Sequence, residues 1–106
     1  MNTLVMKNLE IDLLIDLLSN QCSDILSKVW RNDDLVSGVF ILEEPKVKDL
    51  GVSITTVVEH KVPDATCKLT IHGSRVLDQT EVAEAAEAHL RQTLIEFAEE
   101  NEWAWE

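Results

Sequence analysis

The sequence predicts an α+β protein, a two-layer sandwich of order α-β-β-β-α in which two helices pack on one face of a three-stranded antiparallel meander. Apolar residues recur every three or four positions near both ends of the chain, and three β-type runs separated by short polar turns lie between them. A chain of 106 residues can bury one core. No linker or repeat divides it, so we expect a single α+β domain over residues 1–106.

The first helix is predicted over residues 9–30, with Asn8 as its N-cap. Leu13 and Leu17 widen its apolar side beyond a narrow stripe. We therefore expect the helix either to lie deep against the sheet or to contact a second subunit through these two leucines. The apolar stripe itself consists of Ile11, Leu14, Leu18, Cys22, Ile25 and Val29.

Three strands are predicted next, over residues 35–42, 52–60 and 66–72. The first run is almost wholly apolar and the second is rich in β-branched residues. The third alternates, which places Cys67, Leu69 and Ile71 toward the core. Because the connections are short, we expect these strands to pair antiparallel, with one face solvated and the other available to the helices.

The last helix is predicted over about residues 79–101, after a DQTE capping box at residues 78–81. Larger apolar residues, including Leu90 and Leu94, fall on one side of it. The small residues Ala83, Ala85 and Ala86 permit a close approach to the sheet, while glutamates fall largely on the opposite side.

Negative charge is concentrated toward the end of the chain. Residues 78–106 hold nine carboxylates and one cation, Arg91, in a chain whose formal net charge is −11. Such a field repels phosphate and attracts cationic groups over about 10 Å. We therefore expect a basic protein surface as the partner, with no direct binding of nucleic acid, although rows of exposed acids also serve solubility alone. The candidate partner-binding carboxylates are Glu81, Glu84, Glu87, Glu96 and Glu99.

Two tryptophans, Trp103 and Trp105, follow the last helix. One interpretation is that both rings fold back onto the core, at the sheet edge or against Trp30. The other is that they anchor a partner, because tryptophan supplies much interface energy from few residues. The second interpretation adds both residues to the candidate partner-binding set.

No catalytic or metal motif is evident. His60 and His72 fall at opposite ends of the predicted sheet and His89 falls on the helix, so none has the spacing of a metal site. Ser74, beside His72, is the nearest approach to a nucleophile with a base, but serine in such a turn usually serves the backbone. With three glycines and no phosphate-binding loop, the chain is expected to bind no cofactor or metal and to be no enzyme.

The richest apolar block, residues 9–18, is interrupted by Glu10, Asp12 and Asp16. It is therefore too polar to span a bilayer core of about 30 Å, and it lacks the cationic start and cleavage site of a signal peptide. We expect no membrane contact and a cytoplasmic location. Cys22 and Cys67 show no CxxC spacing and are expected to be buried, reduced thiols, with a disulfide between them as the alternative.

The segment IHGSRVLDQTEVAEAAEAHLRQTLIEF closes an element order that is similar to that of double-stranded-RNA-binding domains. In that family a basic cluster at the start of the last helix contacts phosphate. Here the matching positions carry Glu81, Glu84 and Glu87. The similarity is therefore one of topology, and RNA binding by this helix is disfavoured.

The leading hypothesis is a small inhibitor that engages a basic surface of a nucleic-acid-handling protein, partly by mimicking phosphate charge, as phage counter-defence and toxin-immunity proteins do. The alternative is a homodimeric acidic adaptor of the secretion-chaperone type, with Leu13 and Leu17 at the subunit contact. An enzyme whose site is assembled from distant residues is the third hypothesis.

Overall fold

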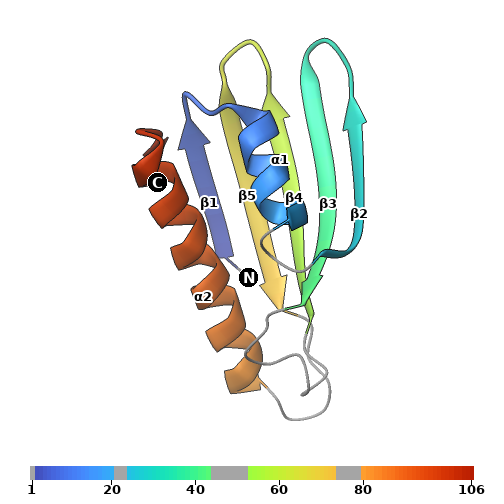
Figure 1. Ribbon diagram of the computed structural model, residues 1–106, viewed down its shortest axis with the longest axis vertical. Helices are drawn as coiled ribbons and strands as arrows, with labels where there is room; N and C mark the ends of the chain where they lie inside the picture. The colour runs from blue at the N-terminus through green and yellow to red at the C-terminus, as the bar shows by residue number, and fades with distance from the viewer. Residues whose placement is uncertain (1, 21–23, 44–52, 74–79) are drawn as a thin grey trace.

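The computed structural model describes residues 2–20, 24–43, 53–73 and 80–106. In these ranges the chain forms two helices and six strands. Figure 1 shows how the helices and strands β1 to β5 are arranged. In chain order they are β1 (Asn2–Lys7), α1 (Ile11–Asn20), β2 (Asp24–Arg31), β3 (Leu35–Glu43), β4 (Ser53–Lys61), β5 (Thr66–Gly73), α2 (Thr80–Glu100) and β6 (Ala104–Trp105).

The strands form one antiparallel sheet in the order β2-β3-β4-β5-β1-β6. Strands β2 to β5 are neighbours in both the sequence and the sheet. The N-terminal strand β1 pairs with the other side of β5. The short β6 then pairs with the outer edge of β1, where Val5 and Glu106 exchange backbone hydrogen bonds of 3.1 and 2.8 Å. Covering this edge satisfies β1 backbone groups that would otherwise be open to another strand.

The α+β class and the antiparallel sheet are confirmed, but the predicted three-stranded meander is too small. Strands β3, β4 and β5 are the predicted runs, and their bounds differ from the prediction by one residue at most places. Strand β1 was missed because its alternation is short: Leu4 and Met6 are buried while Thr3 and Lys7 are exposed. The observed order also departs from that of double-stranded-RNA-binding domains, because β1, β2 and β6 join the sheet.

The predicted first helix over residues 9–30 is wrong in its second half. Helix α1 ends at Asn20, and the segment DILSKVWR forms β2. Its apolar residues suit both a helical and an alternating period, and pairing with β3 supplies the backbone hydrogen bonds that decide between them. Asn8 is not the N-cap either, since it lies in a left-handed turn (φ 61°) three residues before the helix.

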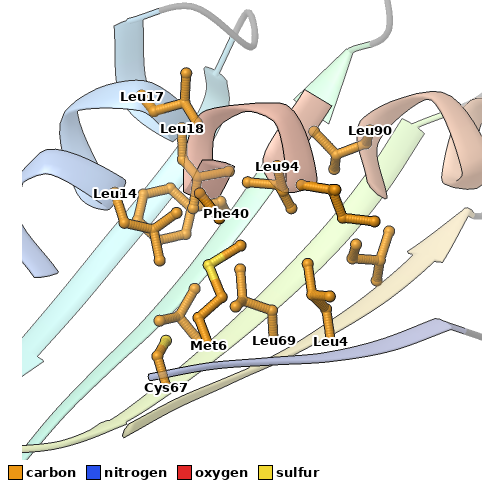
Figure 2. Close-up of a cluster of buried hydrophobic side chains, with 14 of the residues drawn as sticks. Leu4, Met6, Leu14, Leu17, Leu18, Phe40, Cys67, Leu69, Leu90 and Leu94 are labelled. Carbon is orange, nitrogen blue, oxygen red and sulfur yellow. The ribbon is translucent and has the colours of Figure 1, made fainter. Parts of the chain in front are cut away.

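The core lies on one face of the sheet, between the strands and both helices (Figure 2). Leu14, Leu17 and Leu18 come from α1, and Leu90 and Leu94 come from α2. Burying a side chain of this size stabilises the fold by about 1.5–3 kcal/mol before entropy is subtracted. The strand residues that meet them include Leu4, Met6, Phe40, Leu42, Ile54, Val58, Cys67, Leu69 and Ile71.

Gly73 allows the first half of α2 to lie close to the end of β5. A Cβ atom at this position would stand 2.9 Å from the backbone oxygen of Ala83 and 3.2 Å from its Cβ. Any larger residue would push the helix away from the sheet, because such contacts lie below van der Waals distance. The prediction that small residues of the last helix permit close approach is therefore confirmed at Ala83. It is wrong for Ala85, which is exposed.

Within the described ranges, neither helix is long and apolar enough to cross a membrane.

Candidate functional site

The outward side of α2 carries exposed carboxylates in two groups. Glu81 and Glu84 are exposed at its start, and Glu96 and Glu99 are exposed near its end. Twelve residues separate Glu84 from Glu96, which corresponds to about 18 Å along an α-helix. The predicted row of acids is thus two clusters rather than one continuous strip.

Glu87 is not part of either cluster. Its side chain is buried (2% exposed), and its Oε1 accepts a 2.7 Å hydrogen bond from the backbone N–H of Gly73. The same oxygen lies 3.9 Å from Nδ1 of His72. Glu87 therefore fastens α2 to the end of β5 instead of facing a partner. The signal in the sequence was its spacing, four residues after Ala83 and three before Leu90, which places it on the buried stripe.

A pocket of about 170 Å³ opens between the two helices. Leu17 of α1 and Phe97 of α2 are its apolar walls, and Glu96 and Glu100 add two carboxylates from successive turns. Thr93 completes the lining. This pocket could not be predicted from the sequence, because its shape depends on how α1 lies relative to α2.

The carboxylate of Glu96 is held at the pocket by its own helix. Gln92, one turn earlier, donates a hydrogen bond of 3.3 Å from Nε2 to Oε1 of Glu96. Both side chains are exposed, so this bond orients the carboxylate without removing it from water. An oriented acid beside an apolar wall suits a ligand that has an apolar stem and a cationic end.

The two leucines predicted for a subunit contact have different surroundings. Leu17 is 3% exposed and belongs to the core, so it is not available to a second subunit. Leu13, one turn earlier, is 39% exposed. The exposed apolar surface of α1 is therefore narrower than the sequence suggested.

The two terminal tryptophans also differ. Trp103 is 6% exposed and packs edge-on against Phe97, with ring centroids 5.3 Å apart and planes at 79°. The chain folds back through a Schellman turn, in which the Trp103 N–H donates to the Ala98 carbonyl at 2.8 Å. Glu102 takes the left-handed position (φ 61°) that glycine usually occupies, so this turn lacks its usual signal in the sequence.

Trp105 remains partly exposed (39%) at the sheet edge, opposite Met6 in the register. The guanidinium carbon of Arg91 lies 6.0 Å from its ring centroid, a cation–π distance. Arg91 is therefore occupied with Trp105 at the side of α2, while the acids of that helix face outward.

We use the name acidic helix layer for the exposed carboxylates of α1 and α2. Arg91 is the one cation within the bounds of these two helices, and it is only half exposed. Asp12 is paired with Arg31 of β2 at 2.8 Å, so the excess of negative charge lies chiefly on the α2 side. The members of the layer are Asp12, Asp16, Glu81, Glu84, Glu96, Glu99 and Glu100.

The buried titratable groups face each other across β4 and β5. His60 and Cys67 are register partners on the core face, and both are buried. Burial lowers the pKa of His60 and raises the pKa of the Cys67 thiol to about 12, so near pH 7 this cysteine is a protonated thiol. In the described ranges no group of three or more histidine, cysteine or acidic side chains could hold a metal ion. Ser74 and Cys22 lie outside those ranges.

Comparisons with protein-family models, with curated proteins and with solved structures find no match for this chain.

Proposed function

We propose that the protein is a small acidic binding protein that uses the acidic helix layer to engage a basic surface of a nucleic-acid-handling protein, as an inhibitor that partly mimics phosphate charge. The observation that carries the proposal is the pocket between the helices. There Phe97 is the accessible apolar side chain beside the carboxylates of Glu96 and Glu100, while Leu17 lines the pocket only through the 3% of its surface that is exposed. One small site thus offers an apolar surface for the aliphatic stem of a lysine or arginine side chain and carboxylates for its charged end.

The size of the pocket favours a side chain over a cofactor. Sites for small molecules usually enclose about 300–1,000 Å³, whereas this pocket holds about 170 Å³. The aliphatic stem of a partner's lysine or arginine would lie along Phe97, and its cationic head would reach Glu96 or Glu100. Arginine would gain more than lysine, because its planar group can bind a carboxylate through two hydrogen bonds.

The spacing of the acids gives the mimicry its physical basis. Glu96, Glu99 and Glu100 repel one another on one helix, and a like-charged pair one turn apart costs about 0.2–0.5 kcal/mol of helix stability. A basic groove that normally neutralises phosphates would relieve this repulsion on binding. It would also release counterions, so affinity should fall as salt rises.

The test uses a fluorescein-labelled peptide of alternating lysine and leucine, with fluorescence anisotropy as the readout. The variant Glu96→Lys/Glu100→Lys should bind this peptide at least tenfold more weakly than the unchanged protein. The unchanged protein should also displace a duplex oligonucleotide from the peptide, and this variant should not.

The matched control is Asp33→Lys/Asp34→Lys, which changes net charge by the same amount in the exposed turn between β2 and β3. It should keep its affinity for the lysine-leucine peptide within about threefold. If both double variants lose affinity equally, the effect is one of net charge and the pocket has no role.

The second candidate is the homodimeric adaptor, and the observation that favours it is the exposed Leu13. Since Leu17 is used by the core, the contact would centre on Leu13 and the partner's equivalent residue. Sedimentation tests this candidate: a dimer that Leu13→Glu converts to a monomer would support it, and a monomer at all concentrations would contradict it.

A further inference from the structure

The face of the sheet opposite the helices is the second surface of interest. No helix or strand among the described residues packs on it, and its central side chains are partly exposed. We use the name bare sheet face for the outward side chains of β1 to β5. Those used below are Lys7, Trp30, Lys28, Val39, Ile41, Val57, Glu59, Lys61, Lys68 and Thr70.

The centre of the bare sheet face is apolar and β-branched. Val39, Val57 and Thr70 are consecutive register partners across β3, β4 and β5, so their side chains stand in one row. Ile41 lies beside them on the same face of β3. Solvated faces of antiparallel sheets usually carry polar residues, so an apolar centre of this kind is a candidate contact surface.

Cations lie at the β2 side of that centre and toward one end of it. Lys28 extends the central row on β2, directly opposite Val39, and its ammonium nitrogen lies 5.3 Å from the ring centroid of Trp30. Trp30 is also exposed and lies on the same face. Lys68, on β5, is the register partner of Glu59, a carboxylate that lies among the lysines.

Two further lysines lie toward one end of the same face. Lys61 and Lys7 are both register partners of Thr66, on β4 and β1 respectively. Lys7 is paired with Glu106 at the sheet edge, at 3.3 Å, so its charge is partly compensated. The cations that remain for a partner are chiefly Lys28, Lys61 and Lys68.

We propose that the bare sheet face binds an acidic polypeptide segment whose apolar side chains cover Val39 and Val57. Its carboxylates would lie against the lysines of the rim. Lys28 and Lys68 are three strand spacings apart across the sheet and two residues apart along it. Their separation is therefore about 16 Å, which an extended segment of five residues can bridge. The charge of this face is opposite to that of the acidic helix layer, so the two surfaces select partners of opposite charge.

Charge also argues for a polypeptide over a nucleic acid on this face. The whole chain carries a formal charge of −11, and Glu59 lies among the lysines. A nucleic acid would bring one negative charge per nucleotide into that field, whereas a short acidic segment brings few charges together with apolar groups. This inference does not depend on the proposed function, because the two surfaces share no residue.

The test uses a fluorescein-labelled eight-residue peptide of alternating leucine and glutamate, measured by fluorescence anisotropy against the intact protein. Binding should weaken about tenfold in Lys68→Glu and should tighten in Glu59→Lys. Both residues are exposed, and circular dichroism checks that each variant is folded. Lys68→Gln, with a smaller loss of affinity, serves if the charge reversal unfolds the protein.

Glu84→Lys is the matched control for Glu59→Lys, because it makes the same change of net charge on α2. It should leave the affinity for the leucine-glutamate peptide within about twofold. A glutamate-serine peptide of equal length should bind at least fivefold more weakly. The proposal is overturned if Glu84→Lys tightens binding as much as Glu59→Lys, if the serine peptide binds equally well, or if single-stranded oligothymidine binds this face more tightly.

Discussion

The two faces of the sheet are built from the same strands and yet have opposite surroundings. On β4, Ile54 and Val58 point into the core beneath the helices, whereas Thr55 and Val57 point outward. The covered face is buried and largely apolar, and the acidic helix layer lies beyond it. The other face has an apolar centre with lysines at its β2 side and toward one end.

This difference shows that the two layers of the molecule present surfaces of opposite charge. The helices carry acids, with Arg91 as the cation within their bounds, while the outward side of the sheet presents Lys28, Lys61 and Lys68. Net charge alone, at −11, describes only the first of these surfaces. Paired substitutions of one residue type, one on each face, measure how far the two faces differ.

The largest expected difference is between two isoleucines. Ile54→Ala removes a fully buried side chain on β4 and should lower the free energy of unfolding by about 2–5 kcal/mol. Ile41→Ala, on the bare sheet face of the adjacent β3, should cost about 1 kcal/mol or less. Urea unfolding followed by circular dichroism gives both values. If both substitutions lower the free energy of unfolding by the same amount, the outward face is buried to the same degree as the inward face.

The next difference concerns pH and the two histidines at the ends of β4 and β5. Because burial lowers the pKa of His60, the folded state takes up its proton at lower pH than the unfolded state does. The contribution of His60 to the free energy of unfolding is therefore fully present above pH 6.5, the ordinary pKa of histidine. It is lost as the pH falls from 6.5 to the lowered pKa of the folded state. In that range the free energy of unfolding falls by at most about 1.4 kcal/mol for each pH unit.

Urea unfolding from pH 7.5 to 5 checks this expectation. His60→Leu should remove the part of the slope that belongs to His60. His72→Leu, on the outward face, should leave that part in place. If the free energy of unfolding of His60→Leu depends on pH as that of the unchanged protein does, the dependence does not come from His60.

The smallest expected difference is between adjacent threonines. Thr56 is buried on the covered face, and its hydroxyl has no hydrogen-bond partner in the part of the chain that the structure describes. Thr56→Val removes that unpaired group at nearly constant volume and should stabilise the fold by about 1 kcal/mol. Thr55→Val, on the outward face, should change stability by less than about 0.5 kcal/mol. Thermal unfolding of the two variants is sufficient, and a destabilised Thr56→Val would show that the hydroxyl is satisfied.

The central strands and the last helix were predictable because their signals are local. Alternation placed Cys67, Leu69 and Ile71 in the core, as observed. The segment 24–31 was not predictable, since its apolar residues suit a helix and a strand equally and only the neighbouring β3 decides. The six-stranded sheet and the edge pairing of β6 likewise depend on contacts between distant parts of the chain.

The candidate site was predictable only in part. The exposure of Glu81, Glu84, Glu96 and Glu99 follows from the helical period, and Glu87 could have been excluded by the same period. The burial of Trp103 agrees with one of the two interpretations of the terminal tryptophans. The turn that buries it had no signal in the sequence, because Glu102 adopts a conformation that usually indicates glycine. The pocket and the bare sheet face need the packed structure, since each joins residues from elements far apart in sequence.

Chemical-shift mapping of the ¹⁵N-labelled protein with both peptides tests the opposite charge preferences of the two surfaces most directly. We predict that the lysine-leucine peptide shifts the amides of residues 93–100, beside the pocket. The leucine-glutamate peptide should instead shift those around Val39 and Val57. Shifts from both peptides on one common set of residues would contradict the account.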